Sequence, residues 1–270
     1  MKMIPIPRRV AAGMTLLLIT VASAATAEDM LPTGREGLHG SIGLGVGVRP
    51  AYEGADERKT WLTPNINLYY GDMFFLTGMT AGANLWKHTT AQGLSISAGP
   101  LLALRRGRDA DDNDALTGLG DIDPSLDVGG FVRFRKDGWQ ARADIRKDVT
   151  NGDGGTTVNL SAGYGMPVAR NLRLRGSLDT TWASAAYMNT FYGIDATQSA
   201  NSGIAQYTAE SGFKHVGASL AADYAISREW GGFATVRATR LIGEAADSPI
   251  VATLGSRNQL ATTVGIKYRF

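Results

Sequence analysis

The sequence of 270 residues contains no cysteine. This excludes disulfide bonds as staples of an exported domain, and it excludes a lipid anchor on a cysteine thiol. There is no dense run of Lys and Arg, so nothing favours a nucleic acid as a partner. Beyond Val21 no apolar run is long enough to cross a bilayer as a helix. Each of these absences narrows the class of protein before any motif is considered.

The first 27 residues have the three regions of a secretory signal peptide. Lys2, Arg8 and Arg9 precede an apolar run at 10–21, and small residues follow up to Ala27. The run is too short for a membrane anchor, which is the alternative, so we expect cleavage after Ala27. Residues 1–27 are therefore predicted to be the signal peptide and 28–270 the exported domain. That domain has 24 basic and 25 acidic residues, a formal net charge of −1.

The stretch "SIGLGVGV" at 41–48 has glycine at every second position. A dinucleotide-binding loop would need a helix to follow, but Arg49 and Pro50 come next. A period of two instead predicts a strand with two different faces. One face carries only Gly43, Gly45 and Gly47, and the other carries Ile42, Leu44, Val46 and Val48.

The same alternation recurs along most of the exported domain. At 139–149, 157–166 and 172–179, apolar residues alternate with charged or small ones. The connections between such segments are alternately tight, as at 136–138, 168–171 and 227–230, and long and polar. The long connections are 49–60, 105–121, 183–210 and 243–258. This alternation is typical of outer-membrane barrels, which have short periplasmic turns and long external loops.

A soluble β-sandwich also alternates apolar and polar residues, so the placement of aromatic residues has to separate the two folds. Seven aromatic residues fall near strand ends on the apolar face, where a membrane-interface girdle needs them: Trp139, Tyr164, Trp182, Tyr224, Trp230, Tyr268 and Phe270. We therefore predict an all-β fold, a single antiparallel transmembrane β-barrel of about 12 strands. Ten strands is the alternative, because 72–86 reads either as a short hairpin or as one bent strand.

The face opposite the apolar one is charged in both signs, and in a barrel it faces the lumen. We name this set the lumen charge ladder. It comprises Arg133, Arg135, Arg142, Asp144, Arg146, Asp148, Arg173, Arg175, Asp179, Asp223, Arg237 and Lys267, and Asp127 is expected beside it. Opposite charges on neighbouring strands are expected to pair. Paired rows would block the lumen, whereas an excess of arginine would make a narrow anion-preferring pore.

The chain ends "QLATTVGIKYRF", in which the lipid-facing positions include Val264, Ile266, Tyr268 and Phe270. A final strand that ends on an outward aromatic residue resembles the signal read by the barrel assembly machinery. We expect this strand to close the barrel against the strand at 41–48, with Gly43, Gly45 and Gly47 lining the inside of the seam.

Catalytic and metal-binding patterns are weak. His215 is expected to face the lumen near the external end, within reach of Ser219 or Asp223, but no nucleophile motif surrounds it. "DADDND" at 109–114 begins like a calcium loop, yet position six is Asp114 and position twelve is Gly120, so a solvated external loop fits better. His39 and His88 fall at expected periplasmic ends. We predict no catalytic residues, no cofactor and no metal site.

Several longer motifs resemble those of the MipA/OmpV family of outer-membrane proteins. They are "PAYEGAD" at 50–56, "YYGDMFFLTG" at 69–78, "LTGLGDIDPS" at 116–125, "YMNTFYGI" at 187–194, "SPIV" at 248–251 and the terminal "YRF". The resemblance implies an outer-membrane barrel in a Gram-negative cell, in contact with lipids, lipopolysaccharide and the barrel assembly machinery. It also implies a scaffold for peptidoglycan (murein) remodelling, with a murein lytic transglycosylase and a murein synthase as partners. The alternatives are a small channel or an adhesin, and a lipid-modifying enzyme is a third.

Overall fold

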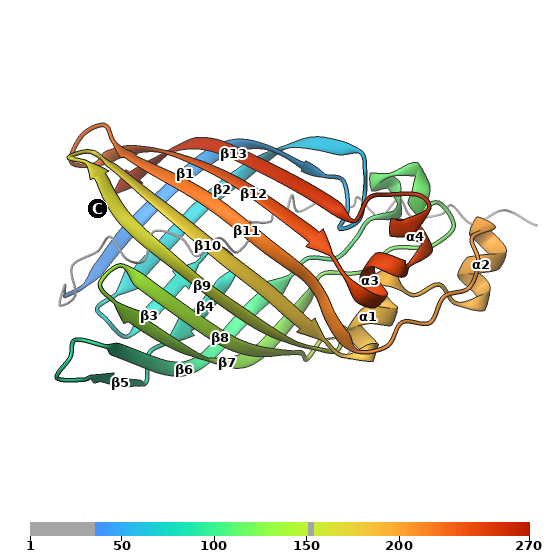
Figure 1. The fold of residues 1–270 in the computed structure, drawn as a ribbon, viewed down its shortest axis with the longest axis horizontal. Coiled ribbons are helices and arrows are strands. Elements are labelled where there is room, and N and C mark those ends of the chain that lie inside the picture. Colours follow the sequence, from blue (N-terminus) through green and yellow to red (C-terminus); the bar gives the residue numbers. More distant parts are fainter. Residues whose placement is uncertain (1–35, 151–153) are drawn as a thin grey trace, which may run out of the picture.

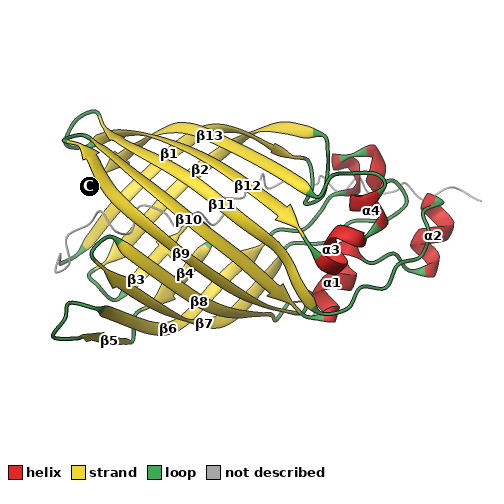
Figure 2. Ribbon diagram, in the orientation of Figure 1, coloured by secondary structure: helices red, strands yellow, loops and turns green. Residues whose placement is uncertain are grey.

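The computed structural model describes residues 36–150 and 154–270, and these form one closed antiparallel barrel (Figures 1 and 2). The predicted signal peptide lies outside the described residues. The strands are β1 Leu38–Pro50, β2 Arg58–Tyr70, β3 Phe74–Thr77, β4 Thr80–Ala83, β5 Trp86–Thr89, β6 Ser95–Arg105, β7 Ser125–Lys136, β8 Trp139–Asp148, β9 Thr156–Ala169, β10 Leu172–Ala183, β11 Gly212–Ala225, β12 Trp230–Leu241 and β13 Asn258–Arg269. The first and last strands pair from Ser41↔Arg269 to Val48↔Thr262, which closes the wall as predicted.

The wall has twelve strand positions, although thirteen strands are defined in the described part of the chain. β4 and β5 both pair with the same edge of β6, one at Leu101–Ala103 and the other at Ser95–Ala98, so they share one position. Within 72–86, β3 and β4 form a short hairpin whose turn begins at Gly78 with φ +57°. The prediction of about 12 strands is confirmed, and of the two alternatives for 72–86 the hairpin is the correct one.

Short and long connections alternate between the two ends of the barrel. Turns at 71–73, 137–138, 170–171 and 226–229 lie at the end that holds both β1's start and Phe270, which is the periplasmic end. The turn at Asp137 and Gly138 has positive φ at both residues, as a two-residue hairpin turn requires. The longer connections 51–57, 106–124, 184–211 and 242–257 lie at the other, external end.

The outer wall exposes the apolar side chains that the alternation assigned to lipid. Leu178 and Val264 are 66% and 63% exposed, which would be unfavourable in water but suits a hydrocarbon environment. Exposed aromatic residues gather at the periplasmic rim. There Trp139 lies 4.9 Å from Tyr164, and Trp230 lies 5.3 Å from Tyr268, between ring centroids. Trp182, by contrast, lies at the external end of β10.

The glycine face of β1 lines the inside of the seam, as predicted. A side chain on Gly45 would approach Phe233 Cζ and Thr263 Cγ2 to 3.0 Å, and Gly45 pairs with Gly265 on β13. Its two neighbours are equally restricted, because a Cβ on Gly43 would collide with Lys267 and one on Gly47 with Thr263. Missing side chains here make room for inward-pointing residues of β12 and β13.

The external loops contain helices, which the sequence analysis did not predict. They are α1 Ala185–Tyr192, α2 Ala196–Ser202, α3 Gly243–Asp247 and α4 Pro249–Ala252, together with the 3-10 turns Ala110–Asp112 and Asp114–Leu116. Local caps start α1 and α2. Ser184 accepts from the Tyr187 N–H, and Asp195 and Gln198 form a reciprocal capping box. Among the described residues, none of the helices is both long and apolar enough to span a bilayer.

Candidate functional site

Every residue of the lumen charge ladder points to the inside of the barrel, and each is buried or half-buried. Strong burial of so many charges is unfavourable unless each finds partners. The ladder residues are organised around three carboxylates, Asp144, Asp179 and Asp223. All three make contacts that the expected pairing between neighbouring strands did not anticipate.

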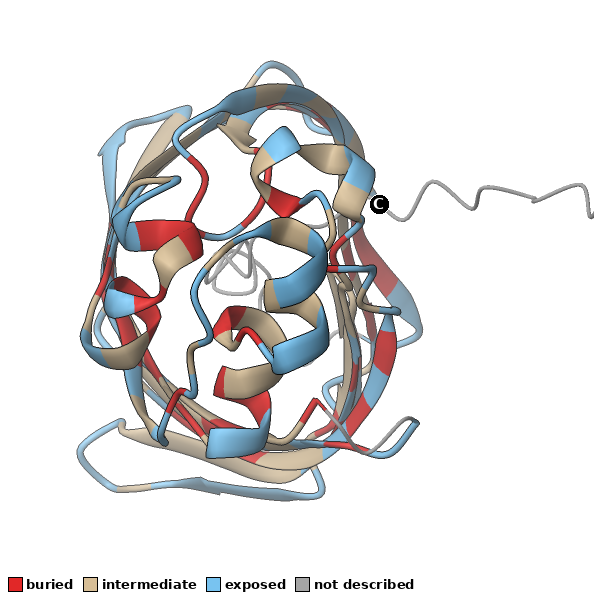
Figure 3. Cartoon of the chain, turned by 90° about the vertical axis from the view of Figure 1, so that its right-hand side faces the viewer, coloured by how far each residue is buried: buried red, intermediate tan, exposed pale blue. Residues whose placement is uncertain are grey.

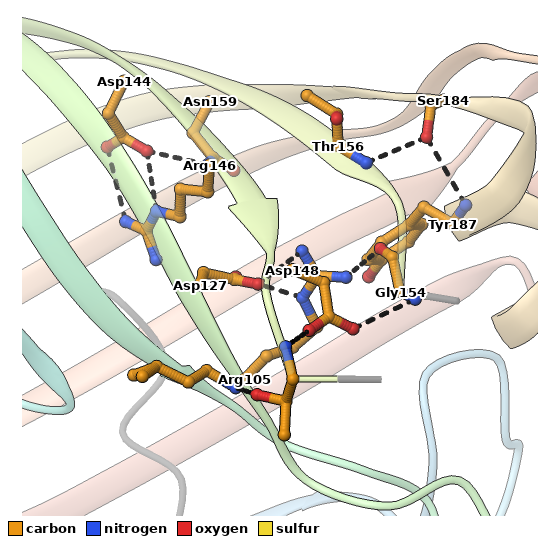
Figure 4. Close-up of polar contacts among 12 residues, drawn as sticks. Arg105, Asp127, Asp144, Arg146, Asp148, Gly154, Thr156, Asn159, Ser184 and Tyr187 are labelled. Carbon is orange, nitrogen blue, oxygen red and sulfur yellow. Dashed lines mark hydrogen bonds and ion pairs between the residues drawn. The ribbon is translucent and has the colours of Figure 1, made fainter. Parts of the chain in front are cut away.

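Asp144 on β8 is 5% exposed and is surrounded by donors (Figure 4). Arg142 and Arg146, two residues away on the same strand, donate to it at 3.0 and 2.8 Å. Asn159 on β9 adds a third hydrogen bond at 2.9 Å. The two arginines therefore share one carboxylate along a strand, because residues i and i+2 face the same side.

Asp179 on β10 binds across a strand rather than to its neighbour. Arg237 on β12 makes two hydrogen bonds to its carboxylate, at 2.6 and 2.5 Å, and His215 on β11 makes one at 3.0 Å. Gly217 on the intervening strand makes this possible, because a Cβ there would lie 2.8 Å from both Arg237 and Asp179. The expectation that His215 meets Ser219 or Asp223 was wrong. Ser219 instead bonds Ser177 at 2.6 Å.

Asp223 on β11 likewise reaches over β12 to pair with Lys267 on β13, which is 3% exposed. Arg173, Arg175 and Arg135 lie toward the periplasmic end of the same interior. These contacts join β11 to β13 beside the seam.

Asp127 and Asp148 stand near the external end (Figure 4). Arg105, which the sequence analysis did not select, pairs with Asp127 at 2.9 Å and also donates to the Gly154 carbonyl. Asp148 has a different role from the ionic one expected. Its carboxylate accepts the backbone N–H groups of Thr150 at 2.8 Å and Gly154 at 3.1 Å, and so holds these two residues at the end of β8.

Above the ladder, the four long loops fold together into a buried core that we name the external plug. It draws residues from each of 51–57, 106–124, 184–211 and 242–257, and Figure 3 shows its helices lying across the mouth. Leu116, Met188, Tyr192 and Ile250 are 0% exposed. Burying each such side chain stabilises by about 1.5 to 3 kcal/mol. The polar loops expected from sequence are thus a packed lid.

Hydrogen bonds tie the loops of the external plug to one another. Tyr52 donates to the Ile250 carbonyl at 2.8 Å, Ser248 to the Tyr192 carbonyl at 2.6 Å and Arg108 to the Phe191 carbonyl at 2.9 Å. Burial, with the nearby carboxylate of Asp56, raises the pKa of Tyr52 to about 12. Burial, together with Glu53, also raises the pKa of Tyr192. Both phenols therefore stay neutral at physiological pH, and Tyr52 keeps its donor.

A cavity of about 540 Å³ lies between the external plug and the ladder. Four carboxylates line it, those of Glu53, Asp112, Asp144 and Asp179. Nine basic side chains face them: Arg49, Arg105, Arg106, Arg108, Arg133, Arg142, Arg146, Lys214 and Arg237. Lys214 is bound to both oxygens of Glu53 at 2.7 Å. Basic side chains therefore outnumber carboxylates in the lining, and one of them, Arg105, is paired with Asp127 just outside it. Such an excess favours anions.

The residues predicted as an assembly signal lie where the alternation placed them. Val264, Ile266, Tyr268 and Phe270 are exposed on the outer wall, where Tyr268 meets Trp230 edge to face and stacks against Phe270. Their role in assembly stays a prediction.

The loop at 109–114 forms two 3-10 turns. Asp109 caps the Asp111 N–H at 2.9 Å, and Asn113 caps the Ala115 N–H at the same distance. Across 36–150 and 154–270, no group of three or more His, Asp or Glu side chains is arranged to hold a metal ion.

A family model described as "MltA-interacting protein MipA" matches residues 42–270. The chain belongs to the MipA family. The MltA-interacting protein of Escherichia coli K12 is 28% identical over 257 residues, covering 94% of this chain and 96% of that relative. YiaT of the same strain, whose name describes an outer membrane protein, is 28% identical over 262 residues, with the same coverage. The barrel is thus an outer-membrane protein.

Solved structures of outer-membrane proteins align with most of the chain, but only at low similarity. OmpT, an outer membrane protein of Vibrio cholerae, aligns with 86% of this chain and 97% of its own at 8% identity and a TM-score of 0.40. The KdgM porin aligns with 86% and 99% at 10% identity and a TM-score of 0.37. Likeness at this level does not extend to function.

Proposed function

We propose that this barrel is a non-conducting, non-enzymatic adaptor that holds a murein lytic transglycosylase, and through it a murein synthase, at the outer membrane. The closed external mouth carries the proposal. A pore needs a continuous polar path, whereas here a buried apolar core spans the mouth and ion pairs cross the interior beneath it. The name of the E. coli relative, which interacts with MltA, supports this class of partner.

The contacts of the lumen histidine, His215, favour a structural role over a catalytic one. His215 is 6% exposed and is bonded to Asp179, whose carboxylate also binds Arg237. The nearest expected nucleophile, Ser219, is engaged with Ser177 instead. A general base needs its proton acceptor directed at a nucleophile, which this arrangement does not provide.

The periplasmic end offers an edge to which a partner can bind. β5 pairs only with β6 among the described strands, and all four of its residues are exposed, with Trp86 at 53%. It projects at the periplasmic end of the barrel, beside the turn at 90–94 (Figure 1). Unpaired edges readily add a strand from another chain. We propose this hairpin as the docking site of the transglycosylase.

A pull-down tests the proposal. The folded barrel, fixed on a column, should retain a purified lytic transglycosylase of the MltA class, and Trp86→Ala should weaken retention at least tenfold. Trp139→Ala is the matched control, since Trp139 is also a well-exposed tryptophan at the same rim. If the enzyme passed through the column of wild-type barrel without being retained, the adaptor role would be contradicted.

The basic excess of the cavity favours one second candidate, a small anion-preferring channel. That function requires the external plug to move aside, so it predicts conductance from the intact protein. An adhesin and a lipid-modifying enzyme have no specific observation in their favour within the described residues.

A further inference from the structure

The lipid-facing side of the barrel wall carries charges of one sign. On the described strands of the wall, with the projecting β5 set aside, four charged side chains occupy outward positions, and all four are basic and exposed: Arg58, Lys136, Lys147 and Arg240. The carboxylates of the same strands lie at inward positions instead. The bases of the outer wall therefore have no acidic neighbour among the strand residues of their own face.

Three of these four bases lie at the external end of the barrel. Arg58 begins β2, and Lys147 and Arg240 are the next-to-last residues of β8 and β12. Lys136 lies at the opposite end, where β7 reaches the periplasmic rim. Basic side chains at a membrane surface are attracted to the anionic headgroups of lipids. The distribution of the bases indicates that the anions to be bound are mainly those of the outer leaflet.

Lys147 is held among apolar side chains that face lipid. Directly opposite it on β7 lies Val128, and Ile145 and Val149 lie two residues before and after it on the same face. All three are about half exposed. Lys147 makes no ion pair or hydrogen bond with the residues that the structure describes. An ammonium group in such a place is unfavourable unless it reaches water or an anion.

The residues beside Lys147 show at which level of the membrane it lies. Ile145 pairs with Val158 on β9, and Val158 pairs with Trp182 at the external end of β10. Trp182 in turn pairs with Phe213 on β11, so aromatic side chains mark the external interface here. Lys147 lies one outward position beyond this row. Its flexible side chain can therefore place the ammonium group in the headgroup layer.

Thr156 supplies a second donor beside the ammonium group. It stands directly opposite Lys147 on β9, so the two Cβ atoms are about 4.5 to 5.5 Å apart. Its backbone N–H donates to Ser184 at 2.9 Å, and its hydroxyl makes no hydrogen bond within the described residues. An ammonium and a hydroxyl at this spacing can both donate to one phosphate group. On the periplasmic side of the pair, Ile145 and Leu160 present exposed apolar surface for an acyl chain.

We propose that Lys147 and Thr156 bind a phosphate group of an outer-leaflet glycolipid, one of whose acyl chains lies along Ile145 and Leu160. The external position of the pair selects the outer leaflet as the source. The apolar surface next to the cation selects a lipid over a free phosphate ion. This site lies on the outer wall and does not depend on the proposed adaptor function, so each can fail without the other.

Native mass spectrometry of the detergent-solubilised barrel tests the site. Bis-phosphorylated lipid A should bind at least fivefold more tightly than lipid A without phosphate. Lys147→Gln should lower that preference at least threefold, whereas Lys147→Arg, which keeps the charge, should retain it. Lys136→Gln is the matched control, because it removes a lipid-facing lysine at the periplasmic end, and it should leave the preference unchanged. An unchanged preference in Lys147→Gln, an equal loss in Lys136→Gln, or displacement of the lipid by equimolar inorganic phosphate would overturn the proposal.

Photo-crosslinking in living cells tests the same site in the membrane. A photo-crosslinking amino acid at Val128, directly opposite Lys147, should capture phosphorylated glycolipid, and Lys147→Gln should lower the yield at least threefold. The same group at Val216, which has a similar exposure on β11, should capture lipid at a yield that does not depend on Lys147. Heat-modifiable gel mobility shows that each variant is folded. A yield at Val128 that Lys147→Gln leaves unchanged would refute the assignment.

Discussion

Replacing Asp179 with Asn should strongly destabilise the barrel, because this carboxylate ties together three strands. It accepts two hydrogen bonds from Arg237 on β12 and one from His215 on β11. Hydrogen bonds to charged groups contribute about 1.5 to 3 kcal/mol each, and removing one partner of a buried ion pair costs about 3 to 5 kcal/mol.

The structure narrows that range. The Asp179 and Arg237 side chains are 19% and 20% exposed, so water partly compensates the loss, and the amide oxygen of Asn still accepts one bond. We therefore expect the free energy of unfolding to fall by about 2 to 4 kcal/mol. Urea unfolding of the barrel in lipid vesicles, followed by tryptophan fluorescence, measures it.

Two further variants complete the test. Asp111→Asn changes an exposed loop carboxylate and should shift the free energy of unfolding by less than about 0.5 kcal/mol. The double variant Asp179→Asn with Arg237→Gln should lose less free energy of unfolding than the two single variants lose in sum, because both changes remove the same ion pair. An Asp179→Asn barrel as stable as Asp111→Asn would refute a structural role for the Asp179 cluster.

Other changes follow from the seam, the terminal strand and the external plug. Gly45→Val should lower the yield of folded protein in the outer membrane, because its Cβ meets Phe233 and the Val264 carbonyl. Gly176→Val has open space around it and should leave the yield unchanged, so equal yields of the two variants would contradict the tight seam. Phe270→Ala should raise periplasmic degradation more than Tyr224→Ala, which changes a rim aromatic of similar exposure. Equal degradation of the two variants would show that Phe270 acts only as one more aromatic residue of the girdle. Met188→Asp should expose the lumen to small dyes while gel mobility still reports an intact barrel, since Met188 lies in the plug core and not in the wall; unfolding of the whole barrel would show instead that plug and wall are one unit.

Much of the barrel was predictable because lipid imposes a strict period of two on the wall. The alternation at 139–149 placed Trp139 and Ile145 outside and Asp144 inside, as the structure has them. The glycines at 43, 45 and 47 were predictable for the same reason. The number of strands depended on 72–86, where Gly78 with positive φ marks a turn that the sequence could equally have used as a kink.

The interior was predictable as a set of charges but not as a set of pairs. Asp179 reaches Arg237 across a strand only because Gly217 leaves the space between them, which depends on register rather than composition. The helices in the external loops have local signals, such as the capping box of Asp195 with Gln198, but these loops are polar on average and show no apolar helical face. The ion pair of Lys214 with Glu53 joins residues 161 positions apart, and the local sequence around either residue does not predict it.

Single-channel recording in planar bilayers tests most directly whether the barrel is a closed adaptor or a pore. The wild-type protein should give no steady current steps, because the external plug buries its core across the mouth. A variant in which a short Gly/Ser linker replaces 185–209, removing α1 and α2, should give steps whose size grows with salt. Steady, salt-dependent steps of the same size from both proteins would contradict a closed mouth and favour the channel.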